Sequence, residues 1–280
     1  MRTADTWRAG SQELHISAPL IMGILNITPD SFYDGGTYSS LDDAMERAAE
    51  MAADGADIID IGGESTRPGA QEISVEEELE RVLPVLEGIT ARQVTPISID
   101  TRKAAVAREA LKAGACIIND VSGLRDPEMA GVVSASKAGI VIMHMQGEPG
   151  TMQKKPLSKQ TVIPVLLAYF KERLEYSERE GIDGKQIVID PGIGFGKTFE
   201  ANEEILRRLE EFLIFSKPVL IGASRKRFIG ERTGEGIEGR LFGSIAAHVI
   251  ACMNGARIIR THDIQATREA LAVTAAVSKA

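Results

Sequence analysis

The sequence has few cysteines, few aromatic residues, no long hydrophobic run and no excess of positive charge. Its only cysteines, Cys116 and Cys252, lie inside apolar runs, which favours two reduced thiols over a disulfide framework or a zinc site. The net charge of −8 argues against a nucleic-acid partner. The first twenty residues hold no apolar stretch long enough for a signal peptide, and no later run approaches a membrane span. We therefore expect a cytoplasmic protein with no membrane partner.

The sequence does contain eight short apolar runs rich in Ile and Val. They are LIMGILN (20–26), DIIDIG (57–62), PISID (96–100), CIIND (116–120), GIVIMH (139–144), QIVID (186–190), PVLIG (218–222) and RIIRTH (257–262). The runs are apolar throughout rather than alternating, which is typical of parallel strands buried on both faces. Amphipathic segments separate them, and several of these end in the Gly-Ala or Ala-Gly pairs expected at helix ends.

This alternation predicts an α/β fold, a single-domain (β/α)₈ TIM barrel over residues 19–280. A doubly wound open sheet is the alternative, because periodicity does not show whether the sheet closes. Residues 1–18 form an N-terminal extension, in which the segment 15–17 is a candidate for a short strand at the barrel floor.

Polar residues follow nearly every apolar run. They are Asn26, residues 64–67, Asp100, Asn119, Asp120, His144, Asp190, residues 224–226, Arg260 and His262. In a parallel barrel all these strand ends open at one mouth, where active sites lie. Single residues have simpler explanations: Asp100 or Ser224 could cap a helix, Asn26 or Asp190 could form a turn, and His144 could be a packed strand-end histidine. Together, however, these charges would be uncompensated at one rim unless a ligand used them.

These residue types suit a heterocycle with a phosphorylated tail. Two carboxylates and an amide match a flat ring edge that carries adjacent N–H groups, and Lys226 could donate to ring acceptors. The Arg260 guanidinium could stack on the ring, and Arg67, Arg260 and His262 suit a phosphate or diphosphate. The loops 26–40 and 62–74 leave strand ends at this rim and are candidates for lids.

The stretch VIDPGIGFGKTFE (188–200) resembles a phosphate-binding loop but lacks its spacing. A Walker loop needs glycine four residues before Gly196, where this chain has Pro191, which has no N–H to donate. We interpret Gly192, Gly194 and Gly196 as a turn after the sixth strand and expect Lys197 and Thr198 on the loop surface.

Several long motifs resemble the dihydropteroate synthase family, the sulfonamide target of folate biosynthesis. They are GILNITPDSFYDGG, DIIDIGGESTRPGA, ISIDTRK, IINDVSG, MHMQGEPGTMQ, IDPGIGFGKT, GASRKRFIG and RIIRTHD. The resemblance runs from about Pro19 to the C-terminus. It implies a pterin-binding TIM barrel that joins 4-aminobenzoate to 6-hydroxymethyl-7,8-dihydropterin diphosphate. The products would be 7,8-dihydropteroate and diphosphate.

The resemblance also implies roles for individual residues. The pterin would contact Asp100, Asn119, Asp190 and Lys226, with apolar walls from Met143 and Phe195. The diphosphate would contact Thr66, Arg67, Arg260 and His262, with Asn26 beside a Mg²⁺ cofactor. The 4-aminobenzoate pocket would include Phe32, Asp34, Pro68, Ser224 and Lys226, and catalytic roles would fall to Asp34, Lys226, Arg260 and His262.

The resemblance further implies a homodimer through C-terminal helices such as 240–254, whose stretch LFGSIAAHVIACM is more apolar than one face of a surface helix requires. Tight packing of that helix on the barrel is the alternative. Two other functions stay open: a pterin-binding methyltransferase barrel and a non-catalytic pterin-binding paralogue.

Displacement at the pterin CH₂ is expected to be dissociative, because the ring nitrogens delocalise the cation, and Asp34 could stabilise that cation. We therefore expect Asp34→Asn to lower turnover strongly while leaving pterin binding intact. Steady-state turnover and equilibrium binding of the pterin substrate measure the two effects separately. Unchanged turnover would refute this role for Asp34.

Overall fold

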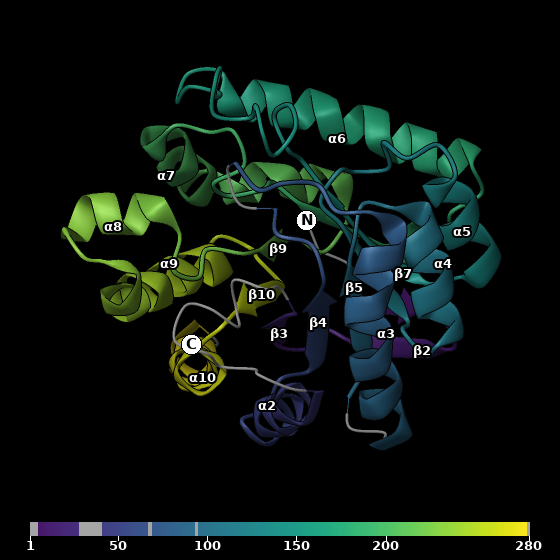
Figure 1. Ribbon diagram of the computed structural model, residues 1–280. Helices are drawn as coiled ribbons and strands as arrows, with labels where there is room; N and C mark the ends of the chain where they lie inside the picture. Colours follow the sequence, from purple (N-terminus) through teal and green to yellow (C-terminus); the bar gives the residue numbers. More distant parts are fainter. Residues whose placement is uncertain (1–4, 28–40, 67–68, 93–94, 279–280) are drawn as a thin grey trace.

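The protein is a closed barrel of parallel strands surrounded by helices (Figure 1). The computed structural model describes residues 5–27, 41–66, 69–92 and 95–278. Within these residues the barrel strands are β3 (Leu20–Asn26), β4 (Ile58–Gly62), β5 (Ile97–Asp100), β6 (Ile117–Asp120), β7 (Gly139–Met143), β8 (Ile187–Asp190), β9 (Leu220–Ile221) and β10 (Ile258–Thr261).

The sheet closes on itself, which confirms the TIM barrel and excludes the open sheet. Its strands follow the order β8-β7-β6-β5-β4-β3-β10-β9, and every neighbouring pair is parallel. The two end strands also meet, because Ile189 forms a parallel bridge with Val219 and its N–H donates to the Pro218 carbonyl over 3.1 Å.

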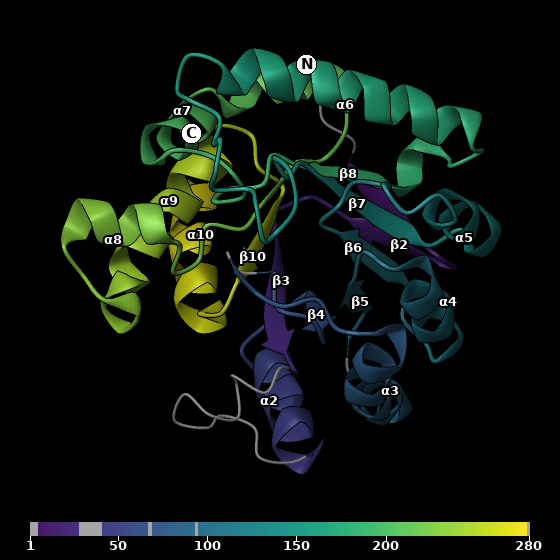
Figure 2. The same ribbon diagram turned by 45° about the horizontal axis from the view of Figure 1, so that its top comes forward.

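The helices form a ring outside the strands (Figure 2). They are α2 (Leu41–Ala53), α3 (Val75–Arg92), α4 (Ala104–Lys112), α5 (Met129–Ser136), α6 (Val162–Arg179), α7 (Phe199–Arg207), α8 (Arg227–Thr233), α9 (Leu241–Met253) and α10 (Ile264–Ser278), with short 3₁₀ turns at Gly184–Gln186, Leu209–Phe215 and Ile237–Arg240. Each amphipathic helix buries one stripe against the sheet, as α4 does with Val106, Ala107 and Ala110. Among the described helices, none is long and apolar enough to cross a membrane.

The floor of the barrel is apolar and is plugged by a hairpin. Strands β1 (Thr6–Ala9) and β2 (Gln12–His15) pair antiparallel, and Trp7 is fully buried against one inward-facing residue from most barrel strands. The Trp7 indole N–H donates to the Gln186 carbonyl over 2.7 Å. A strand was expected at residues 15–17, whereas β2 ends at His15 and pairs with β1 rather than with the barrel.

The barrel interior becomes polar toward the carboxyl ends of the strands. Side chains in a strand alternate between its two faces, so the inward positions lie two residues apart. One such step leads from Ile58 to Asp60 and another from Ile258 to Arg260. The mouth of the barrel therefore holds buried charge above an apolar floor.

Candidate active site

An arginine paired with two carboxylates lies at the centre of the mouth. Arg260 of β10 donates from Nε to Asp60 Oδ2 of β4 and from Nη2 to Asp100 Oδ2 of β5, both over 2.6 Å. Asn119 of β6 donates to the same Asp60 oxygen over 2.9 Å. The parallel sheet brings these four residues together although they are far apart in the sequence, since all of them lie near the carboxyl ends of their strands.

This cluster leaves acceptor atoms without partners. Asp60 Oδ1 and Asp100 Oδ1 are buried and have no hydrogen-bond partner among the described residues. Burial raises the pKa of Asp100 to about 7, against the lowering effect of Arg260, and the nearby carboxylates of Asp60 and Glu78 raise it further. Native proteins rarely leave such atoms unpaired, so the cluster is suited to a ligand that brings N–H donors into the barrel.

Asp60 was not among the residues predicted for the site. The sequence analysis considered residues at the ends of the apolar runs, and Asp60 lies inside one of them. A charged residue within the run DIIDIG was the available signal, because a buried strand tolerates a carboxylate only when a partner compensates its charge.

Asp190 and Lys226 lie on the other side of the mouth: Asp190 ends β8, and Lys226 contacts Phe195 of the loop after β8. Asp190 Oδ1 accepts the Gly192 N–H over 2.7 Å, so this carboxylate does stabilise a turn. Burial raises its pKa to about 6, although the Gly192 hydrogen bond and Lys226 act in the opposite direction. Lys226 Nζ lies 4.2 Å from the centroid of the Phe195 ring, which packs beside a cluster that includes Met143.

The glycines after β8 form the predicted turn, but the position of Lys197 differs from the prediction. Gly192, Gly194 and Gly196 all have positive φ, at 71°, 86° and 67°. Lys197 was expected on the loop surface, and this is wrong: it is 3% exposed. Thr198 also has a structural task, because its hydroxyl accepts the Ala201 N–H at the start of α7.

Lys197 joins the turn after β8 to the end of β7. Its Nζ donates to the carbonyls of His144 and Phe195 over 3.2 and 3.0 Å and lies 3.0 Å from His144 Nδ1. Burial lowers the pKa of Lys197 to about 7, with Asp190 acting to raise it. His144 is the packed strand-end residue of the simpler interpretation, since it is buried with its ring against Tyr169. The loop owes its shape to these bonds.

Ser224 and His262 form a pair on the wall between β9 and β10. The Ser224 hydroxyl accepts the backbone N–H of His262 over 3.2 Å and lies 2.9 Å from its Nδ1. Burial and the nearby Arg260 and Arg225 lower the pKa of His262 to about 3, so the ring is neutral at pH 7. Because the hydroxyl already accepts one proton, it can donate its own to Nδ1, which leaves Nε2–H as a donor.

Asn26 and Asp100 both face the space above Gly62. A Cβ at Gly62 would lie 3.4 Å from Asn26 Oδ1 and 3.8 Å from Asp100 Oδ2, so glycine keeps this space open between the two side chains. Neither helix-cap alternative applies, since Asp100 pairs with Arg260 and Ser224 with His262.

The remaining predicted residues belong to the loops after β3 and β4. Thr66 lies in the segment after β4. Phe32, Asp34, Arg67 and Pro68 lie outside the described residues, so their roles stay predictions.

Comparisons with known proteins agree with this geometry. The sequence profile of a family described as pterin binding enzyme matches residues 22–262. A dihydropteroate synthase of Escherichia coli K12 is 48% identical over 272 residues, which cover 97% of this chain and 96% of that relative. The structure of the Yersinia pestis dihydropteroate synthase with a sulfonamide drug complex superposes with a TM-score of 0.94 at 42% identity, over 98% of this chain and 100% of the other. The Xanthomonas albilineans dihydropteroate synthase with 4-aminobenzoic acid has a TM-score of 0.92 at 43% identity, over 99% and 100%.

The raised pKa of Asp190 makes stability depend on pH. A folded pKa near 6, above the ordinary 3.8, contributes stability that is present below about pH 4 and lost as pH rises through 6. Asparagine keeps the oxygen that accepts the Gly192 N–H but does not titrate. We expect the unfolding free energy of the ligand-free protein, relative to Asp190→Asn, to fall by about 2 kcal/mol between pH 4 and pH 7.

Urea unfolding at several pH values measures this difference. Asp183→Asn is the matched control, because Asp183 also accepts a nearby backbone N–H and its pKa is lowered, chiefly by that bond to Lys185. Its contribution has the opposite sign, since that stability is present at neutral pH and lost on acidification. A difference for Asp190→Asn that stays constant with pH would contradict the prediction.

Proposed function

This chain belongs to the dihydropteroate synthase family of pterin-binding enzymes, and we propose that the residues at its barrel mouth carry out the reaction of that family. It is a transferase that joins 6-hydroxymethyl-7,8-dihydropterin diphosphate to 4-aminobenzoate, giving 7,8-dihydropteroate and diphosphate. The observation that carries this assignment to particular residues is the buried, incompletely paired cluster of Asp60, Asp100, Asn119 and Arg260.

We propose that this cluster holds the pterin ring. The unpaired oxygen of Asp100 and the Asp190 carboxylate accept from the adjacent N–H groups of the ring edge, and Asn119 adds an amide. Lys226 donates to a ring acceptor from its place above Phe195. Because Asp60 and Asp100 hold the Arg260 guanidinium in one position, its flat face is available for stacking without further ordering.

The described residues predicted for the diphosphate, Thr66, Arg260 and His262, supply little free positive charge. Arg260 is already paired with two carboxylates, and His262 is neutral, so it donates a hydrogen bond rather than a full charge. No group of three His, Cys, Asp or Glu side chains within the described part of the chain could hold a metal. Mg²⁺ does not need such a group, because it commonly takes most of its oxygen ligands from phosphates and water. Asn26 would supply one oxygen ligand, and diphosphate and water would supply the others.

The chain's own residues bind the two substrates, orient them and exclude water from the reacting centre. When bound, Mg²⁺ stabilises negative charge on the departing diphosphate. The groups that hold the diphosphate are Thr66, Arg67, Arg260 and His262. Phe195 and Met143 wall the ring and keep water from the pterin cation. Phe32, Asp34, Pro68, Ser224 and Lys226 hold 4-aminobenzoate for attack on the CH₂. No general base is needed, because the arylamine nitrogen sheds its extra proton readily after attack.

We expect diphosphate release that depends on both 4-aminobenzoate and Mg²⁺ and is blocked by a sulfonamide. A methyltransferase barrel or a non-catalytic paralogue would show no such dependence. Release that is unaffected by omitting 4-aminobenzoate would contradict this function.

Asp100→Asn, which removes a charged acceptor, is expected to lower kcat/KM by roughly 10- to 150-fold, since a hydrogen bond to a charged group contributes about 1.5–3 kcal/mol.

We also propose that the enzyme is a cytoplasmic homodimer. Free thiols at Cys116 and Cys252 are typical of a reducing compartment. Helix α9 packs on the barrel through one face, which includes Ala247 and Ala251, but its other face is apolar and exposed. The exposed apolar side chains of α9 and the neighbouring α10 are Phe242, Ile250, Met253, Val273 and Val277. An exposed surface of this kind favours burial against a second copy.

Charge on this surface is expected to separate the two subunits. Phe242 is 84% exposed and Met253 68% exposed, so the double variant Phe242→Asp, Met253→Asp should fold normally and sediment as a monomer. Val165→Asp on α6 is the control, because that side chain is also exposed but α6 lies on another side of the barrel, separated from α9 by α7 (Figure 2). A wild-type protein that sediments as a monomer at micromolar concentration would overturn the dimer.

A further inference from the structure

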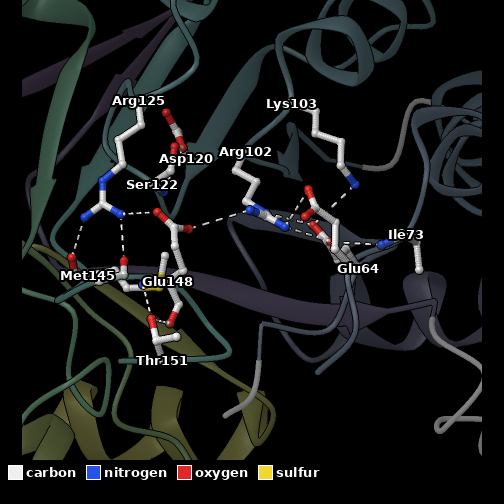
Figure 3. A network of polar contacts seen from close by, with 12 residues as sticks. Glu64, Ile73, Arg102, Lys103, Asp120, Ser122, Arg125, Met145, Glu148 and Thr151 are labelled. Carbon is white, nitrogen blue, oxygen red and sulfur yellow. Dashed lines mark hydrogen bonds and ion pairs between the residues drawn. The ribbon is translucent and has the colours of Figure 1, made fainter. Parts of the chain in front are cut away.

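One arginine holds both ends of the segment that follows β4. Arg102 donates to Glu64 from Nε over 3.1 Å and from Nη2 over 3.3 Å (Figure 3). The same Nη2 lies 3.0 Å from Glu72 Oε1. Glu64 opens the segment and Glu72 closes it, and Glu64 Oε1 also accepts the Ile73 N–H over 3.2 Å. The two described parts of this segment, residues 64–66 and 69–73, are therefore both held by Arg102.

The same arginine reaches the segment that follows β7. Arg102 Nη1 lies 3.7 Å from Glu148 Oε2, and the other Glu148 oxygen accepts from Arg125 over 2.8 Å. Arg125 also donates to the carbonyls of Met145 and Gly147, each over 2.6 Å, which fixes Glu148 in place (Figure 3). Between the segments themselves, the Gly69 N–H donates to the Pro149 carbonyl over 3.4 Å.

Ion pairs rather than packing hold these segments together. A hollow of about 340 Å³ lies between their described parts, lined by Arg102 and by residues of both segments. Of the ion pairs that Arg102 makes, the one with Glu64 is the strongest, because the side chains of Arg102 and Glu64 are only 18% and 6% exposed. Although burial acts to raise it, the hydrogen bond from Arg102 and the charge of Lys103 lower the pKa of Glu64.

We propose that Arg102 is a positioning residue for the second substrate. It holds residues 64–66 and 69–73, which flank Pro68 in the sequence, the residue of this segment that the proposed function assigns to 4-aminobenzoate. The pterin ring is held deeper, by side chains on the strands, so its contacts do not depend on Arg102. The arylamine approaches from the rim that this segment borders. This inference rests on the proposed function and adds to it a residue outside the substrate contacts.

Arg102→Gln tests the proposal, with Arg108→Gln as the matched control. Arg108 lies on α4 and makes one exposed ion pair, to Glu128 over 2.8 Å. We expect Arg102→Gln to raise the KM for 4-aminobenzoate roughly tenfold, since small displacements of positioning groups have effects of this size. Binding of the non-phosphorylated alcohol, 6-hydroxymethyl-7,8-dihydropterin, should not change. Arg102→Lys should be intermediate, because a lysine does not bridge three carboxylates as a guanidinium does.

Hydrogen exchange separates this proposal from the function itself. Backbone amides of residues 64–66 and 69–73, including Ile73, should exchange faster in Arg102→Gln than in Arg108→Gln, whether or not the protein is active. Unchanged exchange there, or an unchanged KM for 4-aminobenzoate in an active enzyme, overturns the proposal. Equal loss of affinity for the pterin alcohol also overturns it, because that result indicates general destabilisation. Absence of 4-aminobenzoate-dependent turnover in the wild type rejects the proposed function. The exchange result then decides separately whether Arg102 holds residues 64–66 and 69–73.

Discussion

The pairing of Arg260 with Asp60 and Asp100 is the interaction on which the barrel mouth depends. It buries a guanidinium and two carboxylates where the interior would otherwise be apolar, and it links strands β10, β4 and β5 across the barrel. Removing one member of such a buried set typically costs about 3–5 kcal/mol, because the remaining charge loses its partner. The pairing is also incomplete, since one oxygen of each carboxylate has no partner in the described structure. A cluster that must be buried and is not fully satisfied favours a ligand that completes it.

Stability and recognition are divided between the two ends of the barrel. The floor is an apolar cluster closed by Trp7, whose single polar atom is satisfied by Gln186. The mouth contains Asp100 and Asp190, and burial raises the pKa of both carboxylates. Their ionised forms are unfavourable in the empty protein and become favourable when N–H donors arrive. In the proposed function, the free energy of pterin binding therefore includes relief of a desolvation penalty that the fold maintains, while the apolar floor supplies the stability that offsets this penalty.

The fold and the strand-end residues could be predicted because they depend on local pattern. Continuous apolar runs ending in Asp100, Asn119 and Asp190 require only that parallel strands open at one mouth. The contacts that complete the site could not be predicted in this way. Arg260 meets Asp60 across 200 residues of sequence, and nothing in either strand specifies that partner. Lys197 was assigned to the loop surface once a phosphate-binding loop had been excluded, yet the loop, with its three glycines at positive φ, brings the Lys197 side chain to His144. The hydrophobic periodicity of a sequence specifies neither long-range polar pairs nor the side-chain directions that left-handed turns produce.

The proposed sites of the two substrates differ in stiffness, because one is built on strands and the other is bordered by a rim of connecting segments. Most of the side chains proposed to hold the pterin stand on strands, whose backbone bonds to both neighbours fix them before the ligand arrives. The rim beside them is held by Arg102 and its carboxylates, two of which are more than half exposed. Exposed ion pairs are weak and screened by salt, so this rim has less resistance to displacement than the strands do. A rigid pocket suits a ring that is recognised along its edge, whereas an adjustable rim suits a nucleophile that must enter and a product that must leave past it. The difference in stiffness between strand and rim is therefore a functional property, and it follows from which interactions hold each part.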